Sequence, residues 1–400
     1  MEKKDLDFIL KVLQEIPADP IDVDWYAVMG YLELNRVTVS FYNSAVRLGI
    51  ELPPRVKRKC VNMLAYQKAR NTVMSEWAER ISAELCKQGV QHAFLKGSIL
   101  ANYKFQMFDP KLQAIKYYPM TAEHGRLYSD GERTSNDIDI LINQKNITKL
   151  HQILTALGFE QGYWDFNKNC FCALSRAEIL SRRMNRGETA PYILQLDNNF
   201  LNFIEIDINF SLDHLPGGND CSGGDAVENF LSDVKKYDEK LYGLEETKFF
   251  VHLLLHQYKE STVYSMVRRG KDTELYKYLD IYLFLRKGLV HFGNLVKIAR
   301  GLNLEAECFC VIHTAMEIFD KLKYDKAFIF LMMAAPQDFK RKLEVADPEN
   351  EGKRYYWLKP LRERMTTLNG SQFLYDCPIC PRPTPEAIIN ASREGGDGND

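Results

Sequence analysis

Hydrophobic positions recur along this chain at two spacings, one typical of helices and one typical of strands. Up to residue 89 the apolar residues repeat every three to four positions, as in Leu6, Ile9, Leu10 and Leu13, which predicts amphipathic helices. Tyr26, Met29 and Leu32 continue this spacing, and so do Val46 and Leu48. After Pro53-Pro54 a long helix is predicted from about Arg55 to Gln88, with Gly89 placed to end it. We interpret residues 1–89 as a helical packing segment.

The pattern changes at residue 90. The short run Val90–Leu95 predicts a strand, Lys96-Gly97-Ser98 a turn, and Ile99–Tyr103 the start of a helix. Such a junction can bind phosphate, because glycine lets the backbone approach closely and a helix N-terminus offers free N–H groups. A Gly-Ser pair is common in proteins, so the prediction depends on this strand-turn-helix setting.

The segment Thr134–Ile142 predicts a strand with two acidic residues on one face. Side chains alternate along a strand, so Asp137 and Asp139 would face one way and Ile138, Ile140 and Ile142 the other. Two like charges so close repel each other unless a cation lies between them, and Mg²⁺ prefers oxygen ligands of this kind. A solvent-exposed strand edge is the alternative interpretation.

A second strand with an acidic face is predicted at Phe200–Phe210. Residues 204, 206, 208 and 210 are apolar, whereas Glu205, Asp207 and Asn209 between them are polar, which is the alternation of a half-buried strand. The polar face could simply meet solvent. If the two strands are neighbours, however, their carboxylates would come together.

The intervening and following segments divide the chain. Residues 105–132 are polar and irregular, 147–157 predict a helix ending at Gly158, and 159–172 a strand with a turn. A glycine-rich loop at 216–225 marks a boundary, after which residues 225–333 predict helices, including one from about Asp272 to Leu285 that carries Asp280. We therefore expect four parts: a helical segment (1–89), a core (90–215), a helical domain (216–380) and a disordered tail (381–400).

Other candidate sites are less specific. His252 and His256 lie four residues apart on one helix face, but zinc would need a further ligand, so we interpret them as packed or capping histidines. Cys377 and Cys380 form a lone CxxC, and reduced thiols are the default for all nine cysteines. The arginines Arg176, Arg182, Arg183 and Arg186 could meet phosphates or form a solvated helix face.

Composition narrows the class of partner. The 400 residues are 46% hydrophobic and 26% charged, with a formal net charge of −2, which is ordinary for a globular protein. This charge argues against a long nucleic-acid substrate without excluding one. No apolar run reaches 18 residues and no signal-peptide core follows Met1. We expect a cytoplasmic protein with no membrane partner.

Taken together, these motifs resemble a known family. Leu95-Lys96-Gly97-Ser98, the Arg133-x-Ser135-x-Asp137-x-Asp139 strand and the later acid on an alternating strand resemble the DNA polymerase β-like nucleotidyltransferase superfamily. They are most similar to its bacterial nucleotidyltransferase family proteins. The resemblance covers roughly residues 20 to 300. It implies an α+β fold in which a mixed β-sheet core is flanked by an N-terminal helical segment and a helical C-terminal domain.

The resemblance also implies roles for individual residues. Asp137, Asp139 and Asp207 would be the catalytic carboxylates and would hold two Mg²⁺ ions, with Mn²⁺ as an alternative metal. Lys96, Gly97, Ser98, Arg133 and Ser135 would bind the triphosphate of an NTP such as ATP. The reaction would transfer a nucleoside monophosphate to an acceptor (a small molecule, a peptide or protein, or an RNA end) and release pyrophosphate.

The chain departs from the family pattern at one point. Ser98 and Asp137 are 39 positions apart, more than is usual, so residues 105–132 are interpreted as an insertion. Glu205 shares a strand face with Asp207 and is the alternative third carboxylate. Two further interpretations remain open: an inactive nucleotidyltransferase fold that binds a nucleotide or a partner, and a helical scaffold with incidental acids.

Overall fold

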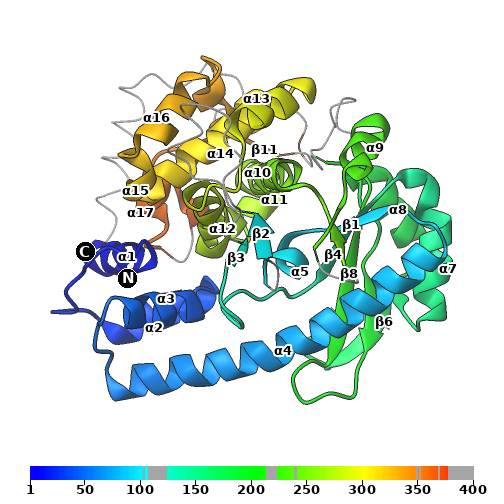
Figure 1. Ribbon diagram of the computed structural model, residues 1–400, viewed down its shortest axis with the longest axis horizontal. Helices are drawn as coiled ribbons and strands as arrows, with labels where there is room; N and C mark the ends of the chain where they lie inside the picture. The colour runs from blue at the N-terminus through cyan, green and yellow to red at the C-terminus, as the bar shows by residue number, and fades with distance from the viewer. Residues whose placement is uncertain are drawn as a thin grey trace.

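The computed structural model describes residues 1–101, 104–106, 124–212, 223–237, 241–347, 350, 353–367 and 370–376. Their backbone combines one large mixed sheet with many helices, which agrees with the α+β class predicted from the sequence. The sheet lies at one end of the molecule and most C-terminal helices lie at the other, with one long helix running beneath both (Figure 1).

The N-terminal helices follow the predicted apolar spacing closely. They are α1 (Lys3–Leu13), α2 (Trp25–Leu34), α3 (Thr38–Arg47) and α4 (Pro54–Lys87). Gly89 follows α4 with a φ of +64°, the left-handed conformation that ends many helices. Two residues counted as apolar markers, Tyr26 and Val46, are exposed. The predicted helices therefore form, but their buried stripes are narrower than the sequence suggested.

The large sheet has the strand order β6-β5-β7-β8-β4-β1-β10-β9. Its strands β4 and β8 pair in parallel, as do β1 and β10, and its other neighbours are antiparallel. The strands are β1 (His92–Phe94), β4 (Ile138–Ile142), β5 (Glu160–Asp165), β6 (Cys170–Ala173), β7 (Tyr192–Gln195), β8 (Phe203–Asn209), β9 (Lys235–Lys236) and β10 (Tyr242–Gly243). The strands β4 and β8 that carry the predicted carboxylates are thus direct neighbours.

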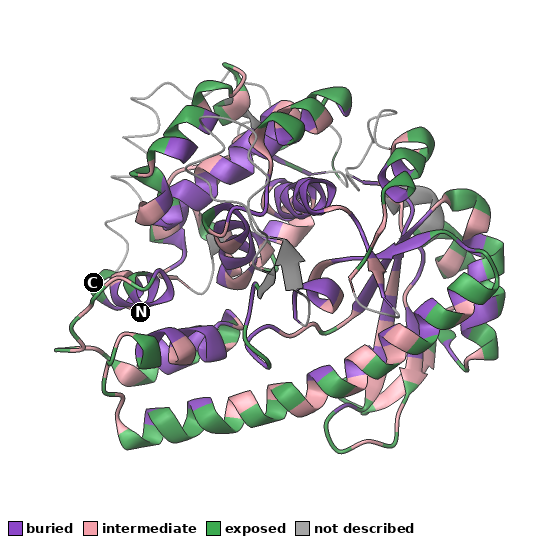
Figure 2. Ribbon diagram, viewed as in Figure 1, coloured by how far each residue is buried: buried purple, intermediate pink, exposed green. Residues whose placement is uncertain are grey.

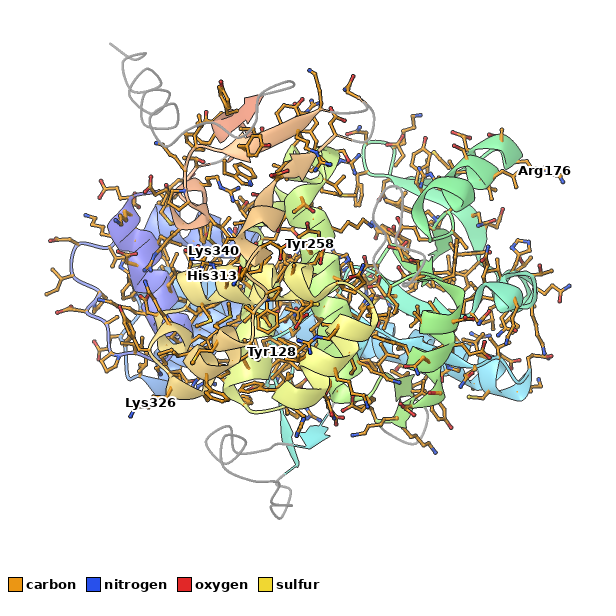
Figure 3. The ribbon with its side chains drawn as sticks, turned by 90° about the horizontal axis from the view of Figure 1, so that it is seen from above. Tyr128, Arg176, Tyr258, His313, Lys326 and Lys340 are labelled. Atoms are coloured by element: carbon orange, nitrogen blue, oxygen red, sulfur yellow. The ribbon has the colours of Figure 1, made fainter. Side chains whose placement is uncertain are left out.

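Four shorter helices and one 3₁₀ turn are connected to this sheet. They are α5 (Lys96–Leu100), η1 (Gln144–Asn146), α7 (Ile147–Ala156), α8 (Arg176–Arg186) and α9 (Gly224–Ser232). The side chain of Arg176, at the start of α8, points outward at the edge of the molecule (Figure 3). Arg176 and Arg182 are exposed, as expected for a solvated helix face, whereas the side chains of Arg183 and Arg186 lie outside the described residues.

The segment interpreted as an insertion is only partly described. It contributes the antiparallel pair β2 (Lys104–Gln106) and β3 (His124–Arg126). Residues 107–123 lie outside the described part of the chain. Further along, Leu127 and Tyr128 are buried, and Tyr128 lies deep inside the molecule (Figure 3). At least the C-terminal end of this segment is therefore part of the packed structure.

The C-terminal part is built around α10 (Glu246–Thr262), whose residues are almost all buried (Figure 2). Around it lie α11 (Tyr264–Val267), η3 (Lys271–Thr273), α12 (Leu275–Arg286), α13 (Phe292–Gly301), α14 (Glu305–Ile318), α15 (Asp320–Lys323), α16 (Lys326–Met333), η4 (Phe339–Leu343), α17 (Leu361–Arg364) and η5 (Gly370–Phe373). A small sheet adds β11 (Val345–Ala346), β12 (Arg354–Trp357) and β13 (Leu374–Asp376).

Two sequence predictions need correction. The stretch 225–333 was predicted as helical, yet β9 and β10 within it extend the large sheet, because strands of two residues show no alternation that a sequence could reveal. Lys96-Gly97-Ser98 was predicted as a turn before a helix, but the helix begins at Lys96 itself. The predicted tail (381–400), Cys377 and Cys380 lie outside the described residues.

Two further observations concern the apolar content of the helices and the state of the cysteines. None of the described helices is long and apolar enough to cross a membrane. Six cysteines in the described part of the chain are free thiols. Cys60, Cys308 and Cys310 are buried, Cys170 and Cys172 are half-buried, and Cys86 is exposed. The remaining boundaries between the predicted parts stay predictions.

Candidate active site

The parallel pairing of β4 and β8 places the acidic residues on one face of the sheet. Asp139 lies directly opposite Asp207 in the strand register, and residues opposite each other on paired strands share a face. By the same alternation, Asp137 and Glu205 lie on that face two residues earlier. The structure therefore brings together all three predicted catalytic carboxylates, together with the alternative Glu205.

Lys96 is the cation closest to this group. Its Nζ lies 2.7 Å from Oδ1 of Asp139, whose side chain is 1% exposed. The other oxygen, Oδ2, is buried and has no hydrogen-bond partner among the described atoms. Lys96 has a φ of +47°, a left-handed conformation that is unfavourable for a residue with a side chain. The backbone at the start of α5 is therefore strained at Lys96, the residue that forms the ion pair with Asp139.

Gly97 lies against the loop that precedes β4. A Cβ atom on Gly97 would lie 2.4 Å from the Cβ and Oγ of Ser135, so no larger residue fits without a shift of the backbone. Ser135 in turn donates a hydrogen bond of 3.0 Å to Oδ1 of Asp137. Contact between Gly97 and Ser135 thus joins the start of α5 to the first carboxylate.

Ser98 has a different position from the one its predicted role requires. It does not line the large cavity described below but a small pocket behind Gly97, together with Asn71 and Ser135. Its Oγ is buried without a hydrogen-bond partner among the described residues. A contact between Ser98 and a triphosphate therefore stays a prediction, and in this arrangement it is less direct than that of Gly97.

A cavity of about 740 Å³ opens over the acidic face. Asp137, Glu205 and Asp207 line it from the sheet, whereas Asp139 lies behind Lys96 and does not. Residues of α4, α10 and α12 form the helical wall of the cavity, to which Arg70, Lys259 and Lys277 contribute positive charge. Four aromatic residues also line it: Tyr66, Phe166, Phe200 and Phe203. Phe166 is 80% exposed.

The four acidic side chains on this sheet face carry more negative charge than the positive groups in contact with them can neutralise. Burial, and then the charges of Asp137 and Asp139, raise the pKa of Glu205 to about 7 and that of Asp207 well above its ordinary value. Burial likewise raises the pKa of Asp139 to about 6, although Lys96 opposes this. At Asp137 burial is outweighed by Lys96 and the Ser135 hydroxyl, which lower its pKa. A bound cation would relieve this crowding.

A buried ion pair joins the site to the C-terminal helices. Arg133 donates to Asp280 on α12, with 3.0 Å from Nε to Oδ1 and 2.8 Å from Nη2 to Oδ2. The hydroxyl of Tyr128 donates to the same carboxylate at 2.6 Å. The ring of Tyr276 lies 4.6 Å from the Arg133 guanidinium. Arg133 does line the cavity, as predicted for a phosphate ligand, but its guanidinium already has a carboxylate partner.

Comparison with known proteins adds one finding. Residues 125–320 match a family described as uncharacterised nucleotidyltransferase. The match supports a nucleotidyltransferase family. It spans just under half of the chain and includes Arg133, Asp137, Asp139 and Asp207, whereas Lys96–Ser98 precede it. No curated protein and no solved structure matches the chain.

The donor atoms of this site suit a hard divalent cation. All the candidate ligands are carboxylate oxygens, and the unpartnered Oδ2 of Asp139 is a buried acceptor that needs a positive partner. In the described part of the chain, no three His, Cys, Asp or Glu side chains converge tightly enough to form a ready-made metal site. The residues therefore fit the metal by chemistry, provided that the Lys96 ammonium moves away from Asp139.

Sequence reasoning missed the residues that helices contribute. Arg36 and Arg70 come from the N-terminal part that we interpreted as packing alone, and His256 from α10 also lines the cavity. A signal was present for Arg70: the buried stripe of α4 contains polar Asn71 between apolar positions, and Arg70 stands next to it. Asp280 was noted on its helix, but its ion pair with Arg133 was not foreseen, because Arg133 lies 147 residues away.

Proposed function

We propose that the protein is a Mg²⁺-dependent nucleotidyltransferase of the DNA polymerase β-like superfamily. It would transfer a nucleoside monophosphate from an NTP to an acceptor and release pyrophosphate. The observation that carries this proposal is the in-register pair Asp139 and Asp207 on adjacent parallel strands, with Asp137 two residues earlier at the cavity. The family match supports general nucleotidyl transfer.

Asp137, Asp139 and Asp207 would hold the divalent cations. When bound, these cations would neutralise the charge that develops on the phosphate oxygens during an in-line displacement. Asp207 lies on β8, on the far side of Asp137 and Asp139 from Gly97, and would accept the proton of the acceptor hydroxyl. The acceptor oxygen forms a bond to the α-phosphorus, and the bond from that phosphorus to the pyrophosphate oxygen breaks.

The backbone near Gly97 and the hydroxyl of Ser135 would orient the phosphates beside Asp137. Lys96 would leave Asp139 when the cations bind and would then be free to neutralise phosphate charge. In this mechanism the ion pair between Lys96 and Asp139 belongs to the empty site. The lysine keeps the buried carboxylate compensated until the nucleotide and its metal arrive.

The same ion pair motivates an alternative function. If Lys96 does not leave Asp139, its ammonium takes the place of a cation, and the protein is an inactive nucleotidyltransferase fold that binds a nucleotide or a partner. A protein of this kind would bind NTP without releasing pyrophosphate. Turnover therefore separates the two functions.

The first experiment measures the melting temperature with each NTP and either Mg²⁺ or Mn²⁺. We expect a rise with nucleotide and metal together, and no rise in the Asp137→Ala/Asp139→Ala variant. Glu228→Gln is a matched control, because Glu228 is an exposed acid on α9 that does not line the cavity. The absence of any nucleotide-dependent shift in the wild type would contradict the proposal.

The second experiment identifies the acceptor. Each α-³²P-labelled NTP is incubated with the protein and a cell extract, and the labelled species is isolated. Label on a new molecule, with equal release of pyrophosphate, supports transfer. Binding without label or pyrophosphate supports the inactive alternative.

A further inference from the structure

Two arginines of the N-terminal helical part line the cavity without a described salt-bridge partner. Neither Arg36 nor Arg70 has a described carboxylate within salt-bridge distance, whereas Lys96, Arg133 and Lys277, which line the same cavity, each do. Both arginines are half-buried. The Nε of Arg70 is buried and has no hydrogen-bond partner among the described residues. The two side chains therefore provide donors that nothing described in the protein uses.

Arg70 is held close to the loop before β4. The next residue on α4, Asn71, donates a hydrogen bond of 2.9 Å from Nδ2 to the carbonyl oxygen of Arg133. Asn71 also shares a small pocket with Gly97 and Ser135. Arg70 is thus held beside the loop that carries Arg133, Ser135 and Asp137.

Arg36 reaches the same region from α2. It follows Asn35, whose Oδ1 accepts a hydrogen bond of 2.9 Å from the backbone of Leu275 at the start of α12. Its guanidinium lies 5.2 Å from the centre of the Tyr276 ring. Its φ of +56° is a left-handed conformation, which costs energy in a non-glycine residue. This conformation ends α2, where the backbone N–H groups of Arg36 and Val37 donate to the carbonyl oxygens of Glu33 and Leu32.

The two positive charges act on each other and on Asp137. Burial lowers the pKa of Arg70 and the charge of Arg36 lowers it further, whereas Tyr66 and Asp137 oppose this shift. Arg36 also helps to lower the pKa of Asp137. Two partly desolvated like charges repel each other, and an anion between them would reverse that repulsion.

We propose that Arg36 and Arg70 form an anion subsite for the β- and γ-phosphates of the NTP and retain the pyrophosphate until it is released. This inference rests on the proposed function. The planar, forked guanidinium group matches phosphate oxygens and can donate to two at once. Asn71 holds Arg70 next to the loop that carries Ser135, where the phosphates are expected.

Calorimetry with three probes tests the subsite: inorganic pyrophosphate, ATP and AMP, each with Mg²⁺. The variants are Arg36→Gln, Arg70→Gln and the double variant. We expect each single variant to raise the Kd for pyrophosphate and for ATP about 10-fold and the double variant about 100-fold, because a hydrogen bond to a charged group is lost each time. The Kd for AMP should stay within about twofold, because AMP has neither phosphate.

Arg80→Gln is the matched control. Arg80 lies on the same helix and loses the same charge, but it is exposed and does not line the cavity, so all three Kd values should be those of the wild type. Should a glutamine variant fail to fold, Arg36→Lys and Arg70→Lys replace it. These variants keep the charge and lose the fork, so we expect a weaker effect in the same direction.

The outcomes separate this inference from the proposed function. Unchanged pyrophosphate affinity in all the variants, or no pyrophosphate binding by the wild type, would overturn the subsite even if nucleotidyl transfer is found. An equal loss of affinity for AMP and for ATP would also overturn the subsite. The arginines would then act only through the overall positive potential of the cavity and not on the β- and γ-phosphates. Arginine-dependent pyrophosphate binding without any nucleotidyl transfer would uphold the subsite while the proposed reaction fails.

Discussion

The two walls of the cavity treat charge in opposite ways. On the sheet, Asp137, Asp139, Glu205 and Asp207 crowd one face of two neighbouring strands, and Lys96 is the only described cation in salt-bridge contact with any of them. At α12, on the helical wall, the charges that are almost fully buried occur in pairs, unlike the half-buried Arg36 and Arg70. Arg133 with Asp280 and Lys277 with Glu260 are two such pairs, and each member is less than a tenth exposed.

This difference separates residues that bind from residues that hold the structure. An uncompensated buried charge lowers stability, and proteins keep it where a ligand will complete it. A buried pair, in contrast, is satisfied before any ligand arrives, and removal of one partner leaves the other stranded. Substitution of the sheet carboxylates should therefore lower function without lowering stability, and breaking one of these buried ion pairs should do the reverse.

The largest effect is expected on the sheet wall. Asp207→Asn should lower nucleotidyl transfer by about 1,000-fold or more, because it removes both a metal ligand and the proton acceptor. In metal-free buffer its free energy of unfolding should equal or exceed that of the wild type, since one of several crowded carboxylates is gone. Activity assays and urea denaturation measure the two effects. A clear loss of stability would show that Asp207 is structural.

The helical wall should give the opposite result. Asp280→Ala leaves the buried Arg133 guanidinium without its carboxylate and should lower the free energy of unfolding by about 3–5 kcal/mol. The double variant Arg133→Met/Asp280→Leu should recover most of this loss, because neither charge is then stranded. Urea denaturation of both proteins tests the pair. A cost below about 1 kcal/mol for Asp280→Ala would contradict this account.

The pH dependence sharpens the comparison at His256, on the helical wall. Burial, followed by the charge of Lys96, lowers the pKa of His256 to about 4, whereas the unfolded chain takes up a proton near pH 6.5. The stabilisation from the neutral ring is therefore complete above pH 6.5 and is lost as the pH falls from 6.5 toward 4. The loss amounts to about 3 kcal/mol at most.

Urea denaturation at several pH values between 4.5 and 7.5 measures this loss. His256→Gln cannot take up the proton, so its stability should depend less on pH across that interval. If the two proteins show the same slope, the histidine titrates in the folded protein as it does in the unfolded chain.

The smallest effect is expected at Gly97, where the start of α5 touches the loop before β4. Gly97→Ala places a Cβ atom against Ser135 and should cost about 1–3 kcal/mol of stability through overpacking. Ser135→Gly removes the opposing atoms, so the double variant should be more stable than Gly97→Ala alone. Thermal unfolding of the four proteins of this cycle gives the coupling. Additive losses would mean that the close contact does not matter.

The sequence predicted the site residues correctly where their positions follow the two-residue alternation of a strand. Alternation alone assigned Asp137 and Asp139 to one strand face and Glu205 and Asp207 to another, and the described strands have these faces. The pairing of β4 with β8 could not be read from the sequence, because about 60 residues separate the two strands. It followed only from the family resemblance.

The helical wall was hidden for a different reason. Arg36, Arg70 and Asp280 meet across more than 200 residues of sequence, and each occurs in a helix or helix end where a charged residue is unremarkable. For Ser98 the local prediction placed the side chain wrongly. Each helix position rotates the side chain by about 100°. Gly97 therefore lines the cavity, whereas Ser98, one position later, does not.

The helix α4 has one more consequence. Its 34 residues extend about 50 Å, and it carries Arg70 and Asn71 near its middle, while its last turns pack beside α7. A single residue inserted after Ser75 would turn the first half of α4 by about 100° relative to the second and swing Arg70 out of the cavity. Seven inserted residues would restore the angle to within about 20° but push the N-terminal helices about 10 Å away. The number of residues in α4 therefore sets both the direction in which Arg70 points and the distance of the N-terminal helices from the sheet.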